Sequence, residues 1–129
     1  MGRVRQPPTV RTQLMATLVP LLPRTWRVVP VERNIDPPDR VTIVLKQGEI
    51  ERAPTAPLGK YAISYVVTVV SPAQTIDRAE IELDDAVLET FNILTGVPWI
   101  NPSKATKVLF QGQYLAYDIA CSIETKKGS

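Results

Sequence analysis

KYAISYVVTVVSP, residues 60–72, is the strongest predicted strand of the chain, and the other predicted elements are arranged around it. One face of this strand would carry large apolar side chains, namely Tyr61, Ile63, Tyr65, Val67 and Val69. The other face would carry small side chains that are nearly all apolar, namely Ala62, Ser64, Val66, Thr68 and Val70. A strand covered on one side only normally shows a strongly polar second face. The sequence therefore predicts a central strand whose second face also needs cover.

Further strands are predicted on both sides of this stretch. The β-branched residues of 26–33 favour a strand, and Pro30 places it at an edge or a bulge because proline cannot donate to a ladder. Residues 41–51 alternate as a strand with a bulge at Gly48, and we expect this strand to pair antiparallel with 60–72. The remaining expected segments are the proline-rich connections 34–40 and 52–59, a loop at 97–106, and two strands at 107–112 and 113–124.

Two helices complete the predicted fold. Leucines at helical spacing, Leu14, Leu18 and Leu21, predict a helix over 10–21, which Pro20 should end or kink near Val19. Residues 71–96 predict a longer helix between Thr75 and Gly96. Its apolar stripe consists of Ile76, Ala79, Leu83, Val87, Phe91 and Leu94.

The order of elements predicts an α+β fold, α-β-β-β-α-β-β. It would have a mostly antiparallel sheet of about five strands, with two helices packed on one face. A length of 129 residues favours one domain, which we expect to span residues 9–125. Residues 1–8 are expected to form a flexible basic arm, and 126–129 a flexible C-terminal end.

The composition provides few of the residue types that enzymes commonly use for catalysis. The chain has no His and a single Cys, Cys121, which the alternation of the last strand places in the core. Asp84 and Asp85 are adjacent on a helix, about 100° apart, and would not form a carboxylate dyad. We therefore expect no catalytic residues, no metal site and no cofactor. The basic N-terminus lacks the apolar run of a signal peptide, and no apolar stretch is long enough to span a membrane.

Charge is divided along the chain. Seven arginines lie in the first third, at positions 3, 5, 11, 24, 27, 33 and 40. Acidic residues crowd the outer face of the long helix, namely Asp77, Glu80, Glu82, Asp84, Asp85 and Glu89. An ordinary solvated surface explains this pattern. The alternative is head-to-tail association, in which a basic edge of one subunit meets the acidic helix of the next.

The second face of the predicted strand 60–72 also favours association with another protein. The last strand carries Asp118 and Glu124 on its own second face, so a complete second layer over the sheet is not expected. An apolar patch at Val66, Thr68 and Val70 is expected instead, and such a patch invites a neighbouring subunit or partner protein.

Several phrases carry a resemblance to a known family: LLPRTWRVVP, TIVLKQ, APLG, KVLF and AYDI. Over residues 11–124 the chain resembles the tail terminator (tail completion) proteins of long-tailed actinobacterial bacteriophages. The resemblance implies a non-enzymatic virion protein, assembled in the bacterial cytoplasm, that forms a ring, usually a hexamer. Such a ring caps the head-proximal end of the tail tube, ends tube polymerisation and joins the head. The implied partners are other copies of the chain, the major tail tube protein and head–tail connector proteins, while DNA passes through the lumen without specific binding.

The resemblance also assigns an interface role to the segments 34–40 and 48–59. Together with the charge pattern and the apolar patch, it gives these candidate interface residues: Arg33, Arg40, Glu49, Glu51, Arg52, Val66, Thr68, Val70, Asp84, Asp85 and Glu89. Two alternatives stay open. One is a head-closure or neck adaptor protein, and the other is a small DNA-binding module that uses the basic arm.

Overall fold

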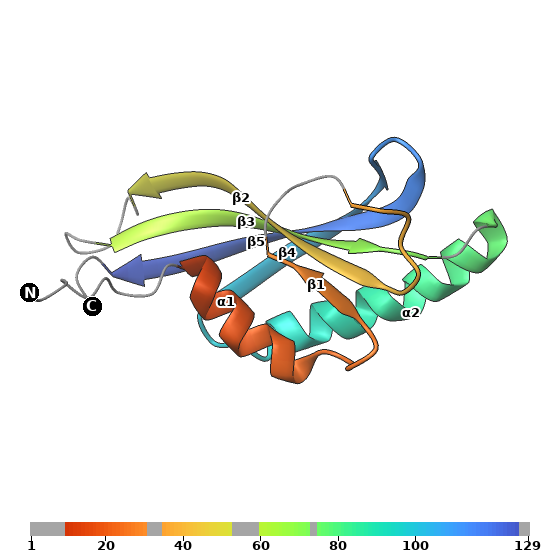
Figure 1. Ribbon diagram of the computed structural model, residues 1–129. Coiled ribbons are helices and arrows are strands. Elements are labelled where there is room, and N and C mark those ends of the chain that lie inside the picture. Colours follow the sequence, from red (N-terminus) through yellow and green to blue (C-terminus); the bar gives the residue numbers. More distant parts are fainter. Residues whose placement is uncertain (1–9, 31–34, 53–59, 73–74, 127–129) are drawn as a thin grey trace, which may run out of the picture.

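The computed structural model (Figure 1) describes residues 10–30, 35–52, 60–72 and 75–126, and within these no side chain at 49–52, 60–62, 76 and 124–126. Its elements are α1 (Val10–Leu18), the 3-10 turn η1 (Val19–Leu21), β1 (Arg27–Val29), β2 (Thr42–Arg52), β3 (Lys60–Val70), α2 (Ile76–Thr95), β4 (Ile100–Phe110) and β5 (Tyr114–Lys126). The predicted α+β class is confirmed. The predicted arm at 1–8 lies outside the described residues, and β5 continues beyond the predicted end of the last strand.

The five strands form one sheet in the order β1-β2-β3-β5-β4, with β3 at its centre and β1 at an edge, as Pro30 predicted. Strands β2 and β3 pair antiparallel, as predicted, with a bulge at Gly48 between the Gln47 and Ile50 pairs. Strand β1 instead runs parallel to β2, with Val28 opposite Ile43. The sheet is therefore mixed, and the prediction of a mostly antiparallel sheet is corrected. Parallel pairing requires the chain to cross over the sheet between the two strands, and residues 30–41 make this connection.

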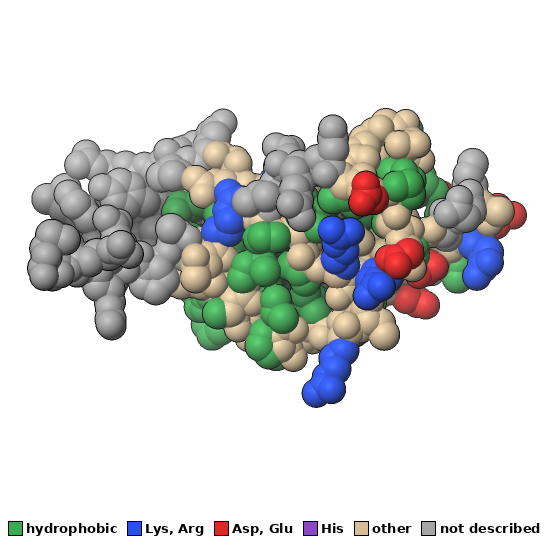
Figure 2. Space-filling model, in the orientation of Figure 1, with side chains coloured by type: hydrophobic (Ala, Val, Ile, Leu, Met, Phe, Trp, Pro, Cys, Tyr) green, Lys and Arg blue, Asp and Glu red, His purple; other side chains and the backbone are tan. Residues whose placement is uncertain are grey.

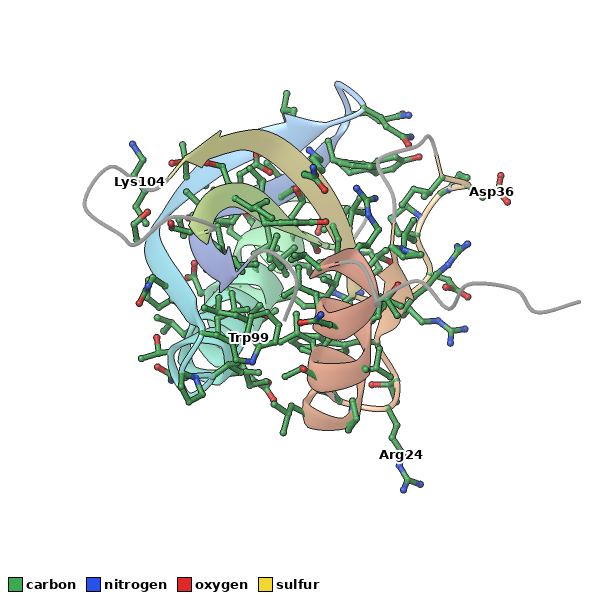
Figure 3. All side chains as sticks on the ribbon, turned by 90° about the vertical axis from the view of Figure 1, so that its left-hand side faces the viewer. Arg24, Asp36, Trp99 and Lys104 are labelled. Atoms are coloured by element: carbon green, nitrogen blue, oxygen red, sulfur yellow. The ribbon has the colours of Figure 1, made fainter. Side chains whose placement is uncertain are left out.

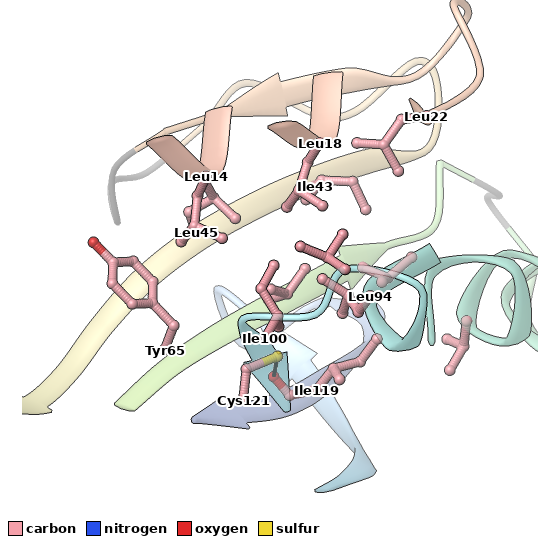
Figure 4. Close-up of a cluster of buried hydrophobic side chains, with 14 of the residues drawn as sticks. Leu14, Leu18, Leu22, Ile43, Leu45, Tyr65, Leu94, Ile100, Ile119 and Cys121 are labelled. Carbon is pink, nitrogen blue, oxygen red and sulfur yellow. Dashed lines mark hydrogen bonds between the residues drawn. The ribbon is translucent and has the colours of Figure 1, made fainter. Parts of the chain in front are cut away.

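Both helices cover the same face of the sheet, as predicted (Figure 1). Leu14, Leu18 and Leu22 pack over Ile43 and Leu45 of β2 (Figure 4). Alongside them, α2 buries Ala79, Leu83, Val87 and Leu94 of its predicted stripe, with Phe91 partly buried. The large face of β3 joins the same core through Ile63, Tyr65, Val67 and Val69. One continuous apolar core thus lies between the helices and the sheet.

The helix ends follow the local sequence. Pro20 ends α1 at Leu18 and tightens the next residues into η1. Because the helical phase is lost there, Leu22 is buried and Leu21 is exposed, so Leu21 does not share the buried side of Leu14 and Leu18 that its helical spacing predicted. Helix α2 begins at a Thr75 cap, whose hydroxyl accepts from the Arg78 N–H at 3.4 Å, and ends before Gly96, both as predicted.

Strand β4 is longer than the sequence predicts. Residues 97–106 were expected to be a loop, yet the strand begins at Ile100 and pairs antiparallel with β5. Pro102 is tolerated because β4 is the outermost strand, and the register shifts beside it, between Pro102 and Lys104. The polar residues and the proline of this segment predicted a loop, but pairing with β5 stabilises it as a strand.

The end of the sheet's second face near Val70 is covered by the chain itself. Ile35, from the connection between β1 and β2, packs with Val44, Val70, Phe110 and Ala116 in a second, smaller cluster. Thr68 is also buried, and its hydroxyl donates to Asp118 Oδ1 at 2.7 Å. The expectation of an exposed patch at Val66, Thr68 and Val70 is therefore wrong, because Thr68 and Val70 are both 0% exposed and Val66 is half-buried. The crossover that makes β1 parallel to β2 also carries the residue that covers this face.

A clamp fastens this crossover to the β4–β5 hairpin. Gln111 Oε1 accepts from the Ile35 N–H at 2.6 Å, and Gln111 Nε2 donates to the Ile35 carbonyl at 3.3 Å. The hairpin turn gives Gln111 a φ of 52° and Gly112 a φ of 72°, and Gln113 N–H closes it onto the Phe110 carbonyl. A left-handed backbone is unusual for a residue with a side chain. Here it directs the amide of Gln111 at the backbone of Ile35.

Candidate interaction surfaces

Among the described residues, no group of His, Cys, Asp and Glu side chains is arranged to hold a metal ion, and no helix is long and apolar enough to cross a membrane. Cys121 is buried in the main core, where burial raises the pKa of its thiol to about 12. The features that stand out are instead exposed apolar side chains. Five large ones are exposed in the described part of the chain, and they fall into two groups.

The first group lies on α2 and β4. Ile81 and Leu88 are seven residues apart, so they share one side of α2, and they are 68% and 65% exposed. Between them lie Asp84 and Asp85, which are exposed, as is Glu89 beside Leu88. Leu109 on β4 is 58% exposed. We call this set, Ile81, Asp84, Asp85, Leu88, Glu89 and Leu109, the acidic face.

A groove lies within the acidic face. It has a volume of about 370 Å³ and is lined by Asp84, Val87, Leu88 and Tyr117, so it runs between α2 and β5. Lys107 of β4 donates to the Glu80 carboxylate at its border, and this hydrogen bond raises the pKa of Lys107, with smaller contributions from Tyr117 and Asp84. Lys107 therefore forms its ion pair with Glu80 of α2. Asp84 and Asp85 have no ion-pair partner among the described residues.

The second group lies where η1 leads into β1. Val19 and Leu21 are 46% and 53% exposed. Arg24 and Arg27 follow them and are exposed without an ion-pair partner among the described residues. We call this set, Val19, Leu21, Arg24 and Arg27, the basic edge. Figure 2 views the molecule from the side of α1 and β1 and shows basic side chains bordering a hydrophobic surface.

Two other arginines, Arg40 and Arg11, interact with groups of the same chain. Arg40 pairs with Asp39, with Nε 3.1 Å from Oδ1, and this contact lowers the pKa of Asp39, to which Arg27 adds a smaller effect. Arg11 donates to the Pro30 carbonyl at 2.8 Å, and its guanidinium lies 5.8 Å from the ring centre of Tyr65. The basic character predicted for the first third therefore resides, among the described arginines, mainly in Arg24 and Arg27.

The two surfaces lie on different elements: the basic edge belongs to η1 and the edge strand β1, whereas the acidic face belongs mainly to α2. Strand β1 is one edge and β4 the other, and α2 packs against β4 and β5. Figure 3 shows Arg24 on one side of the molecule and Lys104 of β4 on the other. Each surface combines exposed apolar side chains with charges of one dominant sign, and the two signs are opposite.

The candidate residues of the sequence are thus separated. Asp84, Asp85 and Glu89 come together on the acidic face, whereas Arg40 is paired with Asp39, close to Arg27 of the basic edge. Arg33 lies outside the described residues. Glu49, Glu51 and Arg52 belong to β2 and not to a loop, and their side chains are not described.

The exposed apolar residues are what the sequence reasoning missed. Ile81 and Leu88 fall outside the buried stripe of α2, so their seven-residue spacing was a readable signal. Leu21 carried no such signal, because only the break in helical phase at Pro20 turns it outward.

No protein-family model and no curated protein matches the chain.

Proposed function

We propose that the chain is a structural protein of a phage tail, a tail terminator that works as a ring. The resemblance of residues 11–124 supports the family. The observation that carries assembly is the pair of oppositely charged surfaces, each with exposed apolar side chains, one on η1 and β1 and the other mainly on α2. A monomeric protein has no need of such paired surfaces, whereas a ring needs two different contact surfaces on every subunit.

In this role the protein works by contact and not by chemistry. The ring would sit on the head-proximal end of the tail tube, block the addition of further tube subunits and present its other side to the head–tail connector. DNA would pass through the lumen. A rigid subunit suits this task, and here one face of the sheet is packed by both helices and one end of the other face by the smaller cluster around Ile35.

Polymerising purified tail tube protein with and without this chain tests the function. With the chain present, tubes should stop growing and carry a ring at one end in negative-stain images. Tubes that grow to the same length and remain bare at both ends would exclude a terminator. Binding to purified connector with no binding to tubes would instead support the neck adaptor, and salt-sensitive binding to duplex DNA would support the DNA-binding module.

A further inference from the structure

We propose that the basic edge of one copy docks onto the acidic face of a second copy, with Leu21 seated in the groove lined by Asp84, Val87, Leu88 and Tyr117. This contact rests on the proposed ring-forming function and names the surfaces that would close the ring. It commits to a second copy of this chain as the occupant of the groove.

The apolar parts of the two surfaces fit each other. The groove has a volume of about 370 Å³, is open to solvent and has Val87 and Tyr117 as its apolar walls. Leu21 projects from the short turn η1 and is 53% exposed, so it can enter a neighbour without unfolding anything. Burying a leucine side chain contributes favourably wherever its surface leaves water.

The charges fit in the same arrangement. Arg24 follows Leu21 by three residues, so it lies within about 11 Å of the seated leucine. Asp84 lines the groove and Asp85 is its neighbour on the same helix. Seating Leu21 therefore brings Arg24 toward Asp84, which has no ion-pair partner among the described residues, while Arg27 and Asp85 add a second charge of the same sign to each surface. Opposite charges of this kind fix the orientation of two partners.

The same charges disfavour the symmetric alternatives. If two acidic faces met, Asp84, Asp85 and Glu89 would confront their own copies, and two basic edges would likewise bring arginines together. Like charges across an interface oppose association. A head-to-tail contact is the arrangement that satisfies both surfaces at once, and repeating it through a rotation closes a ring.

Edge-to-edge pairing of the sheet itself does not explain the surfaces. In the first half of β4, Pro102 lacks a donor and Lys104 is exposed, two features that discourage another strand from adding. At the other edge, β1 spans only Arg27–Val29. The contact is therefore expected to run through side chains.

Charge reversal on each surface, followed by their combination, tests the contact. The acidic-face variant is Asp84→Lys with Asp85→Lys, and the basic-edge variant is Arg24→Glu with Arg27→Glu. Self-association of the full chain is measured by sedimentation velocity over a range of concentrations, and thermal unfolding verifies that each variant is folded. Each variant alone should associate at least about tenfold more weakly than the wild type. Combining both reversals in one chain should restore association, and the matched reversal Lys104→Glu, on β4 away from the groove, should leave it unchanged.

Three results would overturn the contact: a wild-type chain that stays monomeric throughout, a folded single-surface variant that associates normally, or a combined variant that fails to recover. The tail-tube experiment is independent of these outcomes. If a charge-reversal variant still associates normally and still caps tubes, the terminator function stands. Only the proposed contact between the basic edge and the acidic face is then rejected.

Discussion

Single residues decide how the far face of the sheet is closed. Gln111 adopts a left-handed backbone and uses both atoms of its amide to hold Ile35, the residue that covers Val44 and Val70. A residue without a side-chain amide would leave the Ile35 backbone without these two bonds. The sequence alone did not reveal the clamp, because its two partners are 76 residues apart.

Replacing Gln111 tests the clamp. Gln111→Ala should lower the free energy of unfolding by about 1–3 kcal/mol, because two partly buried hydrogen bonds to Ile35 are lost. Gln111→Gly should cost about 1 kcal/mol less than Gln111→Ala, since glycine accepts the φ of 52° without strain. Urea unfolding measures both, and an unchanged free energy in the alanine variant would show that the clamp contributes nothing.

Cys121 predicts how the stability of the folded chain depends on pH. Its pKa is raised to about 12 in the folded chain from an ordinary value of 9.0, so folding disfavours the thiolate. The unfolded chain therefore loses this proton first as the pH rises. Stability is retained below pH 9 and falls, by up to about 1.4 kcal/mol per pH unit, between pH 9 and 12.

Two measurements address the thiol. Below pH 9 the folded chain should react with a thiol reagent only after urea is added. Cys121→Ala should remove part of the loss of stability between pH 9 and 12. Rapid labelling of the folded chain at pH 8 would show that the thiol is accessible and its pKa ordinary.

At the scale of elements, the regular alternation of β2, β3 and β5 and the three-to-four spacing of α2 were enough to predict them. Strand β4 was half missed because Pro102 and Ser103 disfavour a strand that only its partner β5 defines. The parallel direction of β1 was missed as well, because a strand spanning Arg27–Val29 says nothing about direction and neighbouring strands more often pair antiparallel. That direction determined which face Ile35 would cover.

Helix α2 offers a matched pair of substitutions. Leu83→Asp buries a carboxylate without a partner where the leucine is 1% exposed, and should cost at least about 4 kcal/mol and prevent stable folding. Leu88→Asp makes the same change on the same helix at a side chain that is 65% exposed, and should change stability by less than about 1 kcal/mol. Circular dichroism with thermal unfolding distinguishes them, and equal losses would contradict the orientation of α2.

At the scale of the whole molecule, the candidate surfaces were only partly predictable. The uneven distribution of charge along the chain was visible, and Asp84, Asp85 and Glu89 are indeed exposed on α2, while their interface role stays a prediction. The separation of the two surfaces depends on the sheet order and on which strands α2 covers, which no local pattern encodes. The patch at Val66, Thr68 and Val70 was misjudged for the same reason, since its cover comes from distant segments.

Disulfide trapping can show directly whether subunits associate head to tail through the acidic face and the basic edge. Leu21→Cys and Leu88→Cys place one thiol on each surface, while Cys121 stays buried. Under mild oxidation, an equimolar mixture of the two single variants should give a covalent dimer, and the double variant should give a ladder that ends at one closed size. Either single variant should give no dimer alone. A dimer of Leu88→Cys by itself, or no crosslink in the mixture, would contradict the account.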